Sequence, residues 1–261
     1  MKITIMKKVK LILFTGFLLV STSSFSQKDL STYKNVDGVF ISSYWGDINV
    51  MGSDPNDKQS FLLEAIFTDG SKKSITIDDV STYLSFEVKK KKIYIETREP
   101  KGFESIDLKL KIPEHLFLEI ALLKGGNIYS ESFKNGVEIN SLNGSVKLDR
   151  ISKYAFVNAA NGEIDASFDK IDNNYPISLV TMNGGIKVVL PDNAKRDLRL
   201  ISRKNGYVES DFTLDSDKKI INLNSKNYSN QPIINSARIN GGGSLLFLST
   251  ENGPISIKRS F

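Results

Sequence analysis

One short phrase, Asn-Gly followed by alternating apolar residues, returns through the second half of the chain and limits how the chain can fold. The copies begin with Asn143-Gly144, Asn161-Gly162, Asn183-Gly184, Asn205-Gly206 and Asn252-Gly253. The first four are separated by 18, 22 and 22 residues. A phrase that returns at such intervals is typical of repeat architectures, in which each copy is one unit stacked on the next.

Apolar residues lie at fixed offsets from each Asn: four residues before it, and three and five residues after it. In the third copy these are Leu179, Ile186 and Val188, with mostly polar residues between them. Alternation with a period of two predicts a strand on each side of an Asn-Gly corner. Asn and Gly suit the corner because both tolerate positive φ. The positions three residues after the Asn predict one inward row: Val146, Ile164, Ile186, Val208 and Ile255.

Two all-β arrangements fit this pattern. Because the inward offsets match from copy to copy, we favour a β-helix-like solenoid, in which each coil of 18–22 residues lies about 4.8 Å above the last. The Asn side chains would then form a ladder of amide hydrogen bonds, and the coil of Ile186 would lie between those of Ile164 and Val208. Asn-Gly between alternating runs is also the strongest short hairpin signal, so an antiparallel meander stays open.

The N-terminus has the features of a secretory signal peptide. Lysines come first, an apolar run over residues 11–20 follows, and Ser24-Phe25-Ser26 is a small-x-small cleavage site. The run is too short to span a bilayer, which takes about 20 apolar residues. We therefore expect residues 1–26 to be removed and residues 27–261 to form one exported domain, in the periplasm, on the outer surface or outside the cell.

The charge of the chain gives no reason to expect a nucleic-acid partner. Lys and Arg number 35 against 30 Asp and Glu, but residues 1–26 hold four lysines and no acidic residue. Their removal leaves 31 cations against 30 anions, a net charge of about +1. The chain has no cysteine, so disulfides and a lipid-bearing cysteine are excluded. No later segment is apolar enough to predict a transmembrane span.

The strands before the clear repeats are less regular. The repeats are clearest over residues 116–261, whereas residues 36–112 follow the pattern loosely. Trp45-Gly46 fits the phrase if Trp45 takes the Asn place, with Ile41 four residues before it and Ile48 three after. The lysines at 89–92 predict a solvated hairpin tip, with an anionic-ligand patch as the alternative. Irregular strands are suited to covering the end of a stack, which would otherwise expose unpaired backbone.

Three sequence marks carry a resemblance to a known family. They are Ile112-Pro113-Glu114, Leu190-Pro191-Asp192, and the closing stretch from Asn240-Gly241 to Ile257. On these marks residues 36–261 resemble the bacterial DUF4097-type putative adhesin family. The resemblance implies a right-handed parallel β-helix-like fold and a cell-envelope or secreted setting. It brings no catalytic residues to carry over.

Residue types that support catalysis or metal binding are sparse. The single histidine, His115, has no cysteines with which to form a zinc or iron site. The carboxylates Glu163, Asp165, Glu209 and Asp211 alternate outward, so a polysaccharide-active β-helix enzyme remains a remote alternative. The Asp-rich loops at 54–57 and 215–217 could offer oxygens to calcium, but turn chemistry also explains them. We expect no enzymatic activity and no cofactor.

Aromatic residues at the corners give the one indication of binding. Tyr44 and Trp45 lie at the first corner and Tyr207 follows Asn205-Gly206, and exposed rings can stack on sugars or on a protein. A β-edge or end-cap role is the competing interpretation of Trp45. The sequence thus predicts an exported, non-enzymatic, adhesin-like envelope protein that binds a glycan or a protein partner. A purely structural, assembly-forming solenoid is the alternative.

Overall fold

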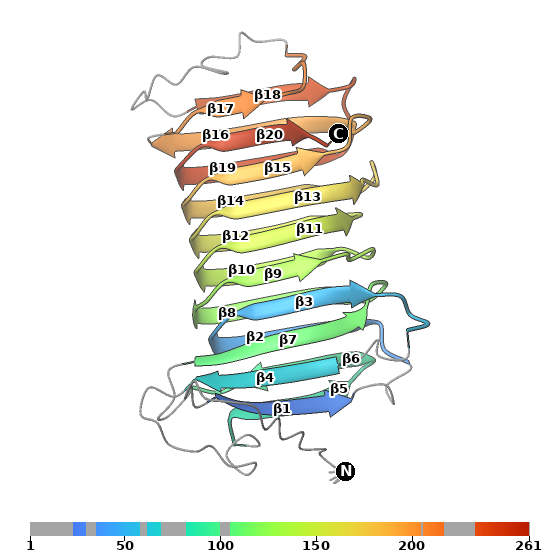
Figure 1. Cartoon of the computed structure of the whole chain (residues 1–261). Coiled ribbons are helices and arrows are strands. Elements are labelled where there is room, and N and C mark those ends of the chain that lie inside the picture. The colour runs from blue at the N-terminus through green and yellow to red at the C-terminus, as the bar shows by residue number, and fades with distance from the viewer. Residues whose placement is uncertain are drawn as a thin grey trace, which may run out of the picture.

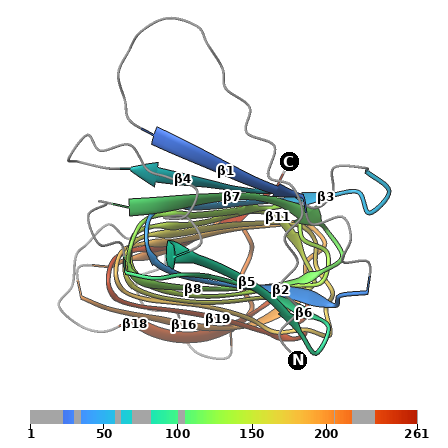
Figure 2. The same cartoon turned by 90° about the horizontal axis from the view of Figure 1, so that it is seen from below.

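The computed structural model describes residues 23–29, 35–57, 62–68, 82–99, 105–204, 206–216 and 233–260. These residues form two ten-stranded sheets that lie face to face along the length of the molecule (Figures 1 and 2). Helical structure in these ranges is confined to one turn at residues 82–83, so the all-β class predicted from the alternation is confirmed. None of the described helical residues forms a helix long and apolar enough to cross a membrane.

The two sheets, named A and B, are each built from strands that follow one another in space in a definite order. Sheet A contains β1 (Ser23–Asp29), β4 (Leu62–Thr68), β7 (Ser105–Pro113), β3 (Ile48–Ser53), β9 (Ile128–Glu131), β11 (Val146–Ser152), β13 (Ile164–Lys170), β15 (Ile186–Leu190), β20 (Ile255–Arg259) and β17 (Val208–Ser210). Sheet B contains β18 (Ile233–Ile239), β16 (Arg196–Lys204), β19 (Leu245–Asn252), β14 (Ile177–Asn183), β12 (Ala155–Asn161), β10 (Val137–Asn143), β8 (Phe117–Gly125), β2 (Gly38–Trp45), β6 (Lys92–Thr97) and β5 (Leu84–Lys89).

Each repeat forms one coil, meaning a strand of sheet B that turns through the Asn-Gly corner into a strand of sheet A. Successive coils pair in parallel: β10 with β12 and β12 with β14 in sheet B, and β11 with β13 and β13 with β15 in sheet A. An antiparallel meander would pair these strands in opposite directions, so that alternative is wrong for the repeats. Two parallel-rich sheets are compatible with a β-helix-like solenoid.

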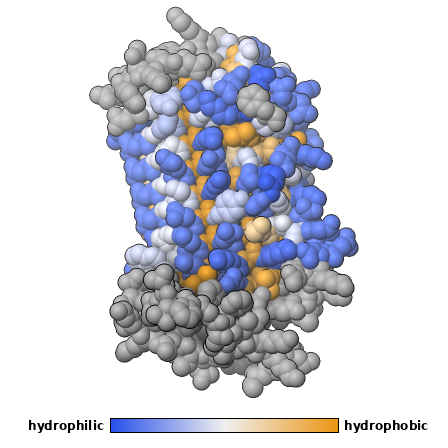
Figure 3. Space-filling view, viewed as in Figure 1, coloured by the Kyte–Doolittle hydropathy of each residue, from blue (hydrophilic) through white to orange (hydrophobic). Residues whose placement is uncertain are grey.

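The core lies between the sheets and is built from the inward phase of the alternation. Val146, Ile164, Ile186, Ile255 and Val208 are each at most 1% exposed. The predicted inward row therefore exists, with each residue opposite the next in register. On the outside the same registration gives columns of like residues, and Figure 3 shows apolar and polar columns running along the stack.

The order of the coils differs from the order of the sequence. The last coil, β19 and β20, lies between the coil of β14 and β15 and the coil of β16 and β17 (Figure 1). Ile186 consequently pairs with Ile255, and Val208 lies on the far side of Ile255. The expectation that the coils of Ile186 and Val208 are neighbours is wrong. Offsets within a repeat fix the register of a coil but not its place in the stack.

The same displacement occurs at the other end. The first coil, β2 and β3, lies between the coil of β8 and β9 and the strands β6 and β7, which come later in the chain. The chain passes over one coil after β7 and again after β15. Each passage begins with a turn at a proline followed by an acidic residue, Pro113-Glu114 or Pro191-Asp192. The amide of Leu116 donates to the carbonyl of Pro113, and the amide of Ala194 donates in the same way to Pro191. Pro113 and Pro191 thus mark two places where the chain skips a coil.

The corner of the fourth copy departs from the predicted register. Lys204, rather than Asn205, pairs with Asn252, and Leu200, rather than Ile201, aligns with Leu248. Val208 still pairs with Ile255, so this corner holds one residue more than the others. Asn205 itself lies outside the described residues.

Antiparallel strands close both ends of the stack. At the N-terminal end β4 pairs antiparallel with β7, β1 with β4, and β5 with β6, and at the other end β18 pairs antiparallel with β16. The irregular strands of residues 36–112 therefore contribute to covering one end, as expected. β1 spans the predicted cleavage site after Ser26, so cleavage there would leave residues 27–29 of this strand.

Candidate functional site

The Asn-Gly corners form a continuous row along one edge of the molecule. The side-chain amide of Asn161 donates to the side-chain oxygen of Asn143 over 2.8 Å, that of Asn183 to Asn161 over 2.7 Å, and that of Asn252 to Asn183 over 2.8 Å. Each internal Asn both donates and accepts, which is the ladder that the repeat predicts. These side chains bond to one another, so the ladder is an element of the fold.

Glycine at the corner is required by close approach of the backbone. Gly144 and Gly162 have φ of +116° and +155°, and a Cβ on either would overlap the carbonyl oxygen of the glycine in the neighbouring coil. The same holds for Gly184 and Gly253, and for Gly206 against Gly253. At the corners of Gly144, Gly162, Gly184 and Gly253, whose Asn residues the structure describes, the Asn does not share the positive φ, so glycine alone takes the left-handed conformation expected for the pair.

The three predicted binding aromatics are divided between the two ends of the corner row. Trp45 takes the Asn place opposite Gly125 and is 47% exposed. Tyr44 donates its hydroxyl proton to Glu99 over 3.0 Å, and the ammonium of Lys124 lies 5.0 Å from the centre of its ring. Tyr207 belongs to the coil of β16 and β17, at the opposite end of the stack. The structure thus places Tyr44 and Trp45 together and Tyr207 apart from them.

The remaining polar candidates occupy ordinary turns and ion pairs. Lys90 and Lys91 form the tip of the hairpin between β5 and β6, with φ of 46° and 61°, as predicted. His115 is exposed in the turn after β7. Asp54 accepts hydrogen bonds from the backbone and side chain of Asn56, and Asp57 pairs with Lys111. Residue 217 of the second Asp-rich loop lies outside the described residues.

Three of the four predicted outward carboxylates pair with cations on adjacent strands, and Glu163 is exposed. Asp165 lies 3.5 Å from Lys187, and Lys258 lies 3.0 Å from Glu209 and 3.4 Å from Asp211. A hydrogen bond from Ser256 and the nearby ammonium of Lys258 lower the pKa of Glu209, which suits an ion pair better than a proton donor. β13 and β17 are separated by two strands, so Asp165 does not face Glu209. Among the described His, Cys, Asp and Glu side chains, no group of three could hold a metal ion.

A row of four aromatic rings, Phe117, Tyr154, Phe156 and Tyr175, lies on the outside of sheet B near the starts of its strands. The ring of Tyr154 is at its centre, with ring centroids 6.3 Å from Phe117, 5.2 Å from Phe156 and 5.9 Å from Tyr175. Spacings of 4.5–7 Å are those of interacting aromatic pairs. Phe117 and Phe156 come from β8 and β12, whereas Tyr154 and Tyr175 come from the loops that precede β12 and β14. We call this set the aromatic row.

The central ring of the aromatic row packs onto the backbone, and charged side chains surround the row. A Cβ at Gly136 would lie 2.5 Å from the ring of Tyr154, so this glycine lets the ring pack onto the backbone. The ammonium of Lys153 lies 4.6 Å from the centre of the Tyr175 ring and donates to Asn135 over 2.8 Å. Burial, with Glu138 nearby, raises the pKa of Tyr154, so its phenol stays protonated.

The aromatic row is partly exposed to solvent. Tyr175 is 38% exposed, and the other three rings are half-buried. At the Phe117 end, Lys92 lies 5.5 Å from the ring centre and pairs with Glu119 at 2.8 Å. The row therefore combines partly exposed aromatic surface with hydrogen-bonding groups at its margins, the combination by which a protein can bind a ligand that has both apolar and polar faces.

The repeat pattern contains a signal for this row that the predictions from sequence missed. Phe117 lies eight residues before Gly125, Tyr154 seven before Asn161, and Tyr175 eight before Asn183. These positions fall at or before the start of each strand, where the loop length varies between coils, so the alternation alone does not align them. Gly136 takes this place before Asn143, in the coil between those of Phe117 and Tyr154. An aromatic at a similar distance before three of these four corners indicates stacked rings.

Comparisons with known proteins identify the fold. No family model and no curated protein matches the sequence. Among solved structures, a putative cell adhesion protein from Clostridium sporogenes ATCC 15579 has a TM-score of 0.51 and 14% sequence identity. The match covers 91% of this chain and all of that one. At this identity the likeness shows a shared fold.

Two further solved structures match over a similar length but with lower structural similarity. A putative adhesin from Bacteroides fragilis NCTC 9343 has a TM-score of 0.34 at 12% identity, covering 94% of this chain and all of that one. A putative lipid binding protein from Parabacteroides distasonis ATCC 8503 has a TM-score of 0.35 at 10% identity, covering 92% and 97%. At these TM-scores neither bears on function.

Proposed function

We propose that this chain is an exported, non-catalytic protein of the cell envelope that binds a glycan through the aromatic row, in the manner of an adhesin. The observation that carries the proposal is the stacking of Phe117, Tyr154, Phe156 and Tyr175 on one outer face. Sugar rings present faces of C–H groups that stack on aromatic rings, while their hydroxyls bond to polar neighbours. Asn135, Lys153 and Glu138 are such neighbours.

The N-terminal sequence and the fold support the proposed setting. The proposal takes residues 1–26 as a signal peptide and residues 27–261 as one right-handed, β-helix-like solenoid of 18–22-residue coils. The Clostridium sporogenes structure that shares the fold is named a putative cell adhesion protein, and the proposal extends that role to this chain. Because the antiparallel strands close both ends of the stack, an extended surface is better suited to binding than the ends are.

Binding of purified protein to a panel of envelope and extracellular polysaccharides tests this function. Tyr175→Ala should weaken binding to the recognised glycan at least about tenfold, because exposed aromatic anchors carry a large share of binding free energy. The backbone carbonyl of Tyr175, which accepts from Arg196, is kept in this variant. Tyr44→Ala, which removes a ring at a distant corner, is the matched control and should bind normally.

Three results would count against the proposal. Binding that is lost in Tyr44→Ala but kept in Tyr175→Ala would move the site to the corner predicted from the sequence. Release of new reducing ends from the bound polysaccharide would show catalysis and contradict the non-enzymatic assignment. Binding of an envelope protein, with no glycan bound, would show that the ligand is a protein rather than a glycan.

A further inference from the structure

The aromatic row continues in both directions across the outer face of sheet B. Beyond Phe117, Phe40 on β2 and Tyr94 on β6 lie in register, with ring centroids 5.7 Å apart. Beyond Tyr175, Phe247 on β19 extends the line, and the guanidinium of Arg199 lies 5.9 Å from the centre of its ring. We call the extended set the aromatic track. It consists of Tyr94, Phe40, Phe117, Tyr154, Phe156, Tyr175 and Phe247.

The aromatic track runs across the strands rather than along them. Its strands, in spatial order, are β6, β2, β8, β10, β12, β14 and β19, stacked along the length of the molecule (Figure 1). Each strand contributes a ring, or has one in the loop before it, except β10. There Gly136 precedes the strand, and the rings of Phe117 and Tyr154 on either side of it have centroids 6.3 Å apart. Because neighbouring strands are about 4.8 Å apart, six intervals give the track a length of about 29 Å.

The rings of the track belong to the outward side of sheet B. Val39 and Ile41 beside Phe40, and Leu246 and Leu248 beside Phe247, are all fully buried, so the rings between them point away from the core. Tyr175 is exposed and the other six rings are half-buried. Aromatic pairs across strands also stabilise a sheet, so a binding role has to be tested separately from folding.

Polar side chains alternate with the rings along the same line. In register from β2 to β19, the outward residues are Phe40, Glu119, Glu138, Phe156, Ser178 and Phe247. Carboxylates accept hydrogen bonds from hydroxyl groups, and a serine both donates and accepts. The track therefore offers hydrogen-bonding groups between partly exposed rings.

A linear polysaccharide matches the track in chemistry and in spacing. Every sugar unit carries both C–H groups, which contact aromatic rings, and hydroxyls, which bond to polar side chains. An extended chain of six-membered sugar rings advances per unit by a length close to one strand spacing, so the track accommodates about six units.

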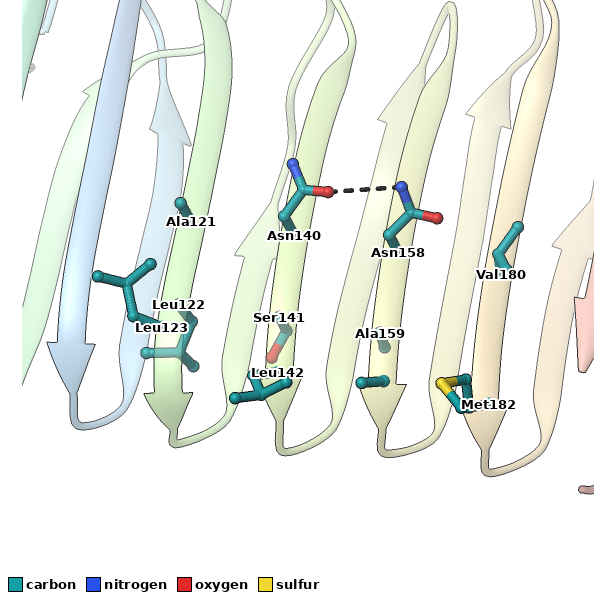
Figure 4. A pocket seen from close by; sticks show the side chains of 11 residues that line it. Ala121, Leu122, Leu123, Asn140, Ser141, Leu142, Asn158, Ala159, Val180 and Met182 are labelled. Carbon is teal, nitrogen blue, oxygen red and sulfur yellow. Dashed lines mark hydrogen bonds between the residues drawn. The ribbon is translucent and has the colours of Figure 1, made fainter. Parts of the chain in front are cut away.

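The opposite end of the same strands does not offer these groups. There Leu123, Leu142 and Met182 border a shallow groove of about 450 Å³, and its lining includes no aromatic ring (Figure 4). The amides of Asn140 and Asn158 in this groove bond to each other over 3.4 Å. The groove thus supplies control positions on the strands that carry the track.

We propose that the ligand is a long, unbranched polysaccharide that lies along the aromatic track, with its chain axis parallel to the stack. This assignment rests on the proposed glycan function and adds the length and the direction of the ligand. A chain bound parallel to the strands could contact the aromatic row, but it could not reach both Phe40 and Phe247, which are five strand intervals apart.

Isothermal titration calorimetry tests the length of the bound chain. The probes are size-fractionated fragments, from the disaccharide upward, of each unbranched polysaccharide that binds in the panel described above. Affinity should rise with each added unit up to about six units and then level off, because longer fragments extend beyond the track.

Variants at the two ends of the track test its direction. Phe40→Leu and Phe247→Leu each remove a ring but keep an apolar side chain over the sheet, and circular dichroism establishes that they are folded. Each should weaken binding of the long fragments at least about fivefold and leave trisaccharide binding unchanged, whereas Tyr175→Ala should weaken both. Met182→Ala, at the other end of β14, is the matched control and should change neither.

The outcomes separate this assignment from the function on which it rests. Affinity that levels off at the trisaccharide, or long-fragment binding that both end variants leave intact, would overturn the extended track and leave glycan binding at the aromatic row in place. A larger loss in Met182→Ala than in Phe40→Leu would move the chain to the groove and equally overturn it. A chain that binds no glycan at all would overturn both.

Discussion

Ile186 lies directly opposite Ile255 in sheet A, although Val208 is much closer to it in the sequence. Val208 pairs with the other side of Ile255, so the last coil of the chain separates two coils that are consecutive in sequence. The same arrangement at the N-terminal end places the first coil inside the stack. Both outermost coils are therefore made by internal segments, and cooperative contacts link segments that are distant along the chain.

Substitution of Ile186 by Asp should cost several kcal/mol of unfolding free energy. Full burial of an Ile side chain contributes about 1.5–3 kcal/mol, and the carboxylate would be desolvated without a partner. Because stacked repeats share their stability with nearest neighbours, hydrogen exchange should accelerate in the strands that hold Ile164 and Ile255. The strand of Val208, one coil farther away, should be affected less.

The control for this experiment is the outward neighbour of Ile186. Lys187 lies in the outward phase of the alternation, so Lys187→Asp would be the direct counterpart of Ile186→Asp. It is unsuitable as a control because Lys187 pairs with Asp165, and the substitution would place two carboxylates together. Lys187→Ala avoids this, and the loss of an exposed ion pair should cost no more than about 1 kcal/mol. Equal destabilisation by the two variants, or faster exchange at Val208 than at Ile255, would contradict the stacking order.

The local structure of this fold can be predicted from sequence because period-two alternation and Asn-Gly pairs act within one coil. Ile164, Ile186 and Val208 point inward as their offsets require, and Asn143, Asn161 and Asn183 bond in a ladder. The order of the coils could not be predicted, since Ile255 and Val208 share the same offset and either could follow Ile186. The extra residue in the corner at Lys204 could not be predicted either, because the Asn-Gly pair is present in the sequence and only its register in the structure is shifted by one position.

The candidate surfaces were less predictable because they depend on contacts between coils. Tyr154 and Tyr175 come from loops of unequal length, and only stacking brings their rings together. Leu142 and Met182 occupy outward positions where the alternation predicts polar residues. Apolar residues at such positions are the sequence signal of an exposed apolar surface. Arg196 is the opposite exception, a charged residue with no exposed surface.

Arg196 should contribute to stability by joining two loops. One of its terminal nitrogens donates to the carbonyl of Tyr175 over 2.7 Å and the other to that of Asp172 over 3.1 Å, while a longer bond of 3.5 Å reaches Ser244. Burial lowers the pKa of its guanidinium to about 10, so it remains a cation at neutral pH. Arg196→Met should cost about 2–4 kcal/mol, because these carbonyls lose their donors.

The matched control for Arg196 is Arg199, an exposed residue of the same strand whose guanidinium lies 5.9 Å from the ring centre of Phe247. Arg199→Met should cost no more than about 1 kcal/mol. Urea denaturation measures both values, and amide exchange at residues 172–175 should accelerate only in Arg196→Met. A stability loss no larger than that of Arg199→Met would show that the carbonyls are satisfied in another way.

Tyr129 should make the fold sensitive to alkaline pH. Its hydroxyl donates to Glu131 over 2.7 Å, and this hydrogen bond, with burial, raises the pKa of the phenol from about 10 to about 12. A raised folded-state pKa contributes stability that is complete below the unfolded pKa and is lost as pH rises through the folded one. Unfolding free energy should therefore fall between about pH 10 and about pH 12, and fall less in Tyr129→Phe. If the unfolding free energy falls equally with pH in the two proteins, the prediction is wrong.

The corner glycines provide the last test. Alanine at a corner should cause both conformational strain and backbone overlap, whereas alanine at Gly241 should cause strain alone. Gly144 has φ of +116° and its Cβ would overlap the carbonyl of Gly126, whereas Gly241 has φ of +83° and open space around it. Gly241→Ala should therefore cost only the strain of a left-handed residue, about 1–2 kcal/mol. Gly144→Ala adds the overlap, which the row of stacked corners can relieve only by moving apart. We expect it to cost more than about 4 kcal/mol and to accelerate amide exchange at Gly126 and Gly162. Thermal unfolding midpoints that fall equally in the two variants would mean that the corners are not in contact.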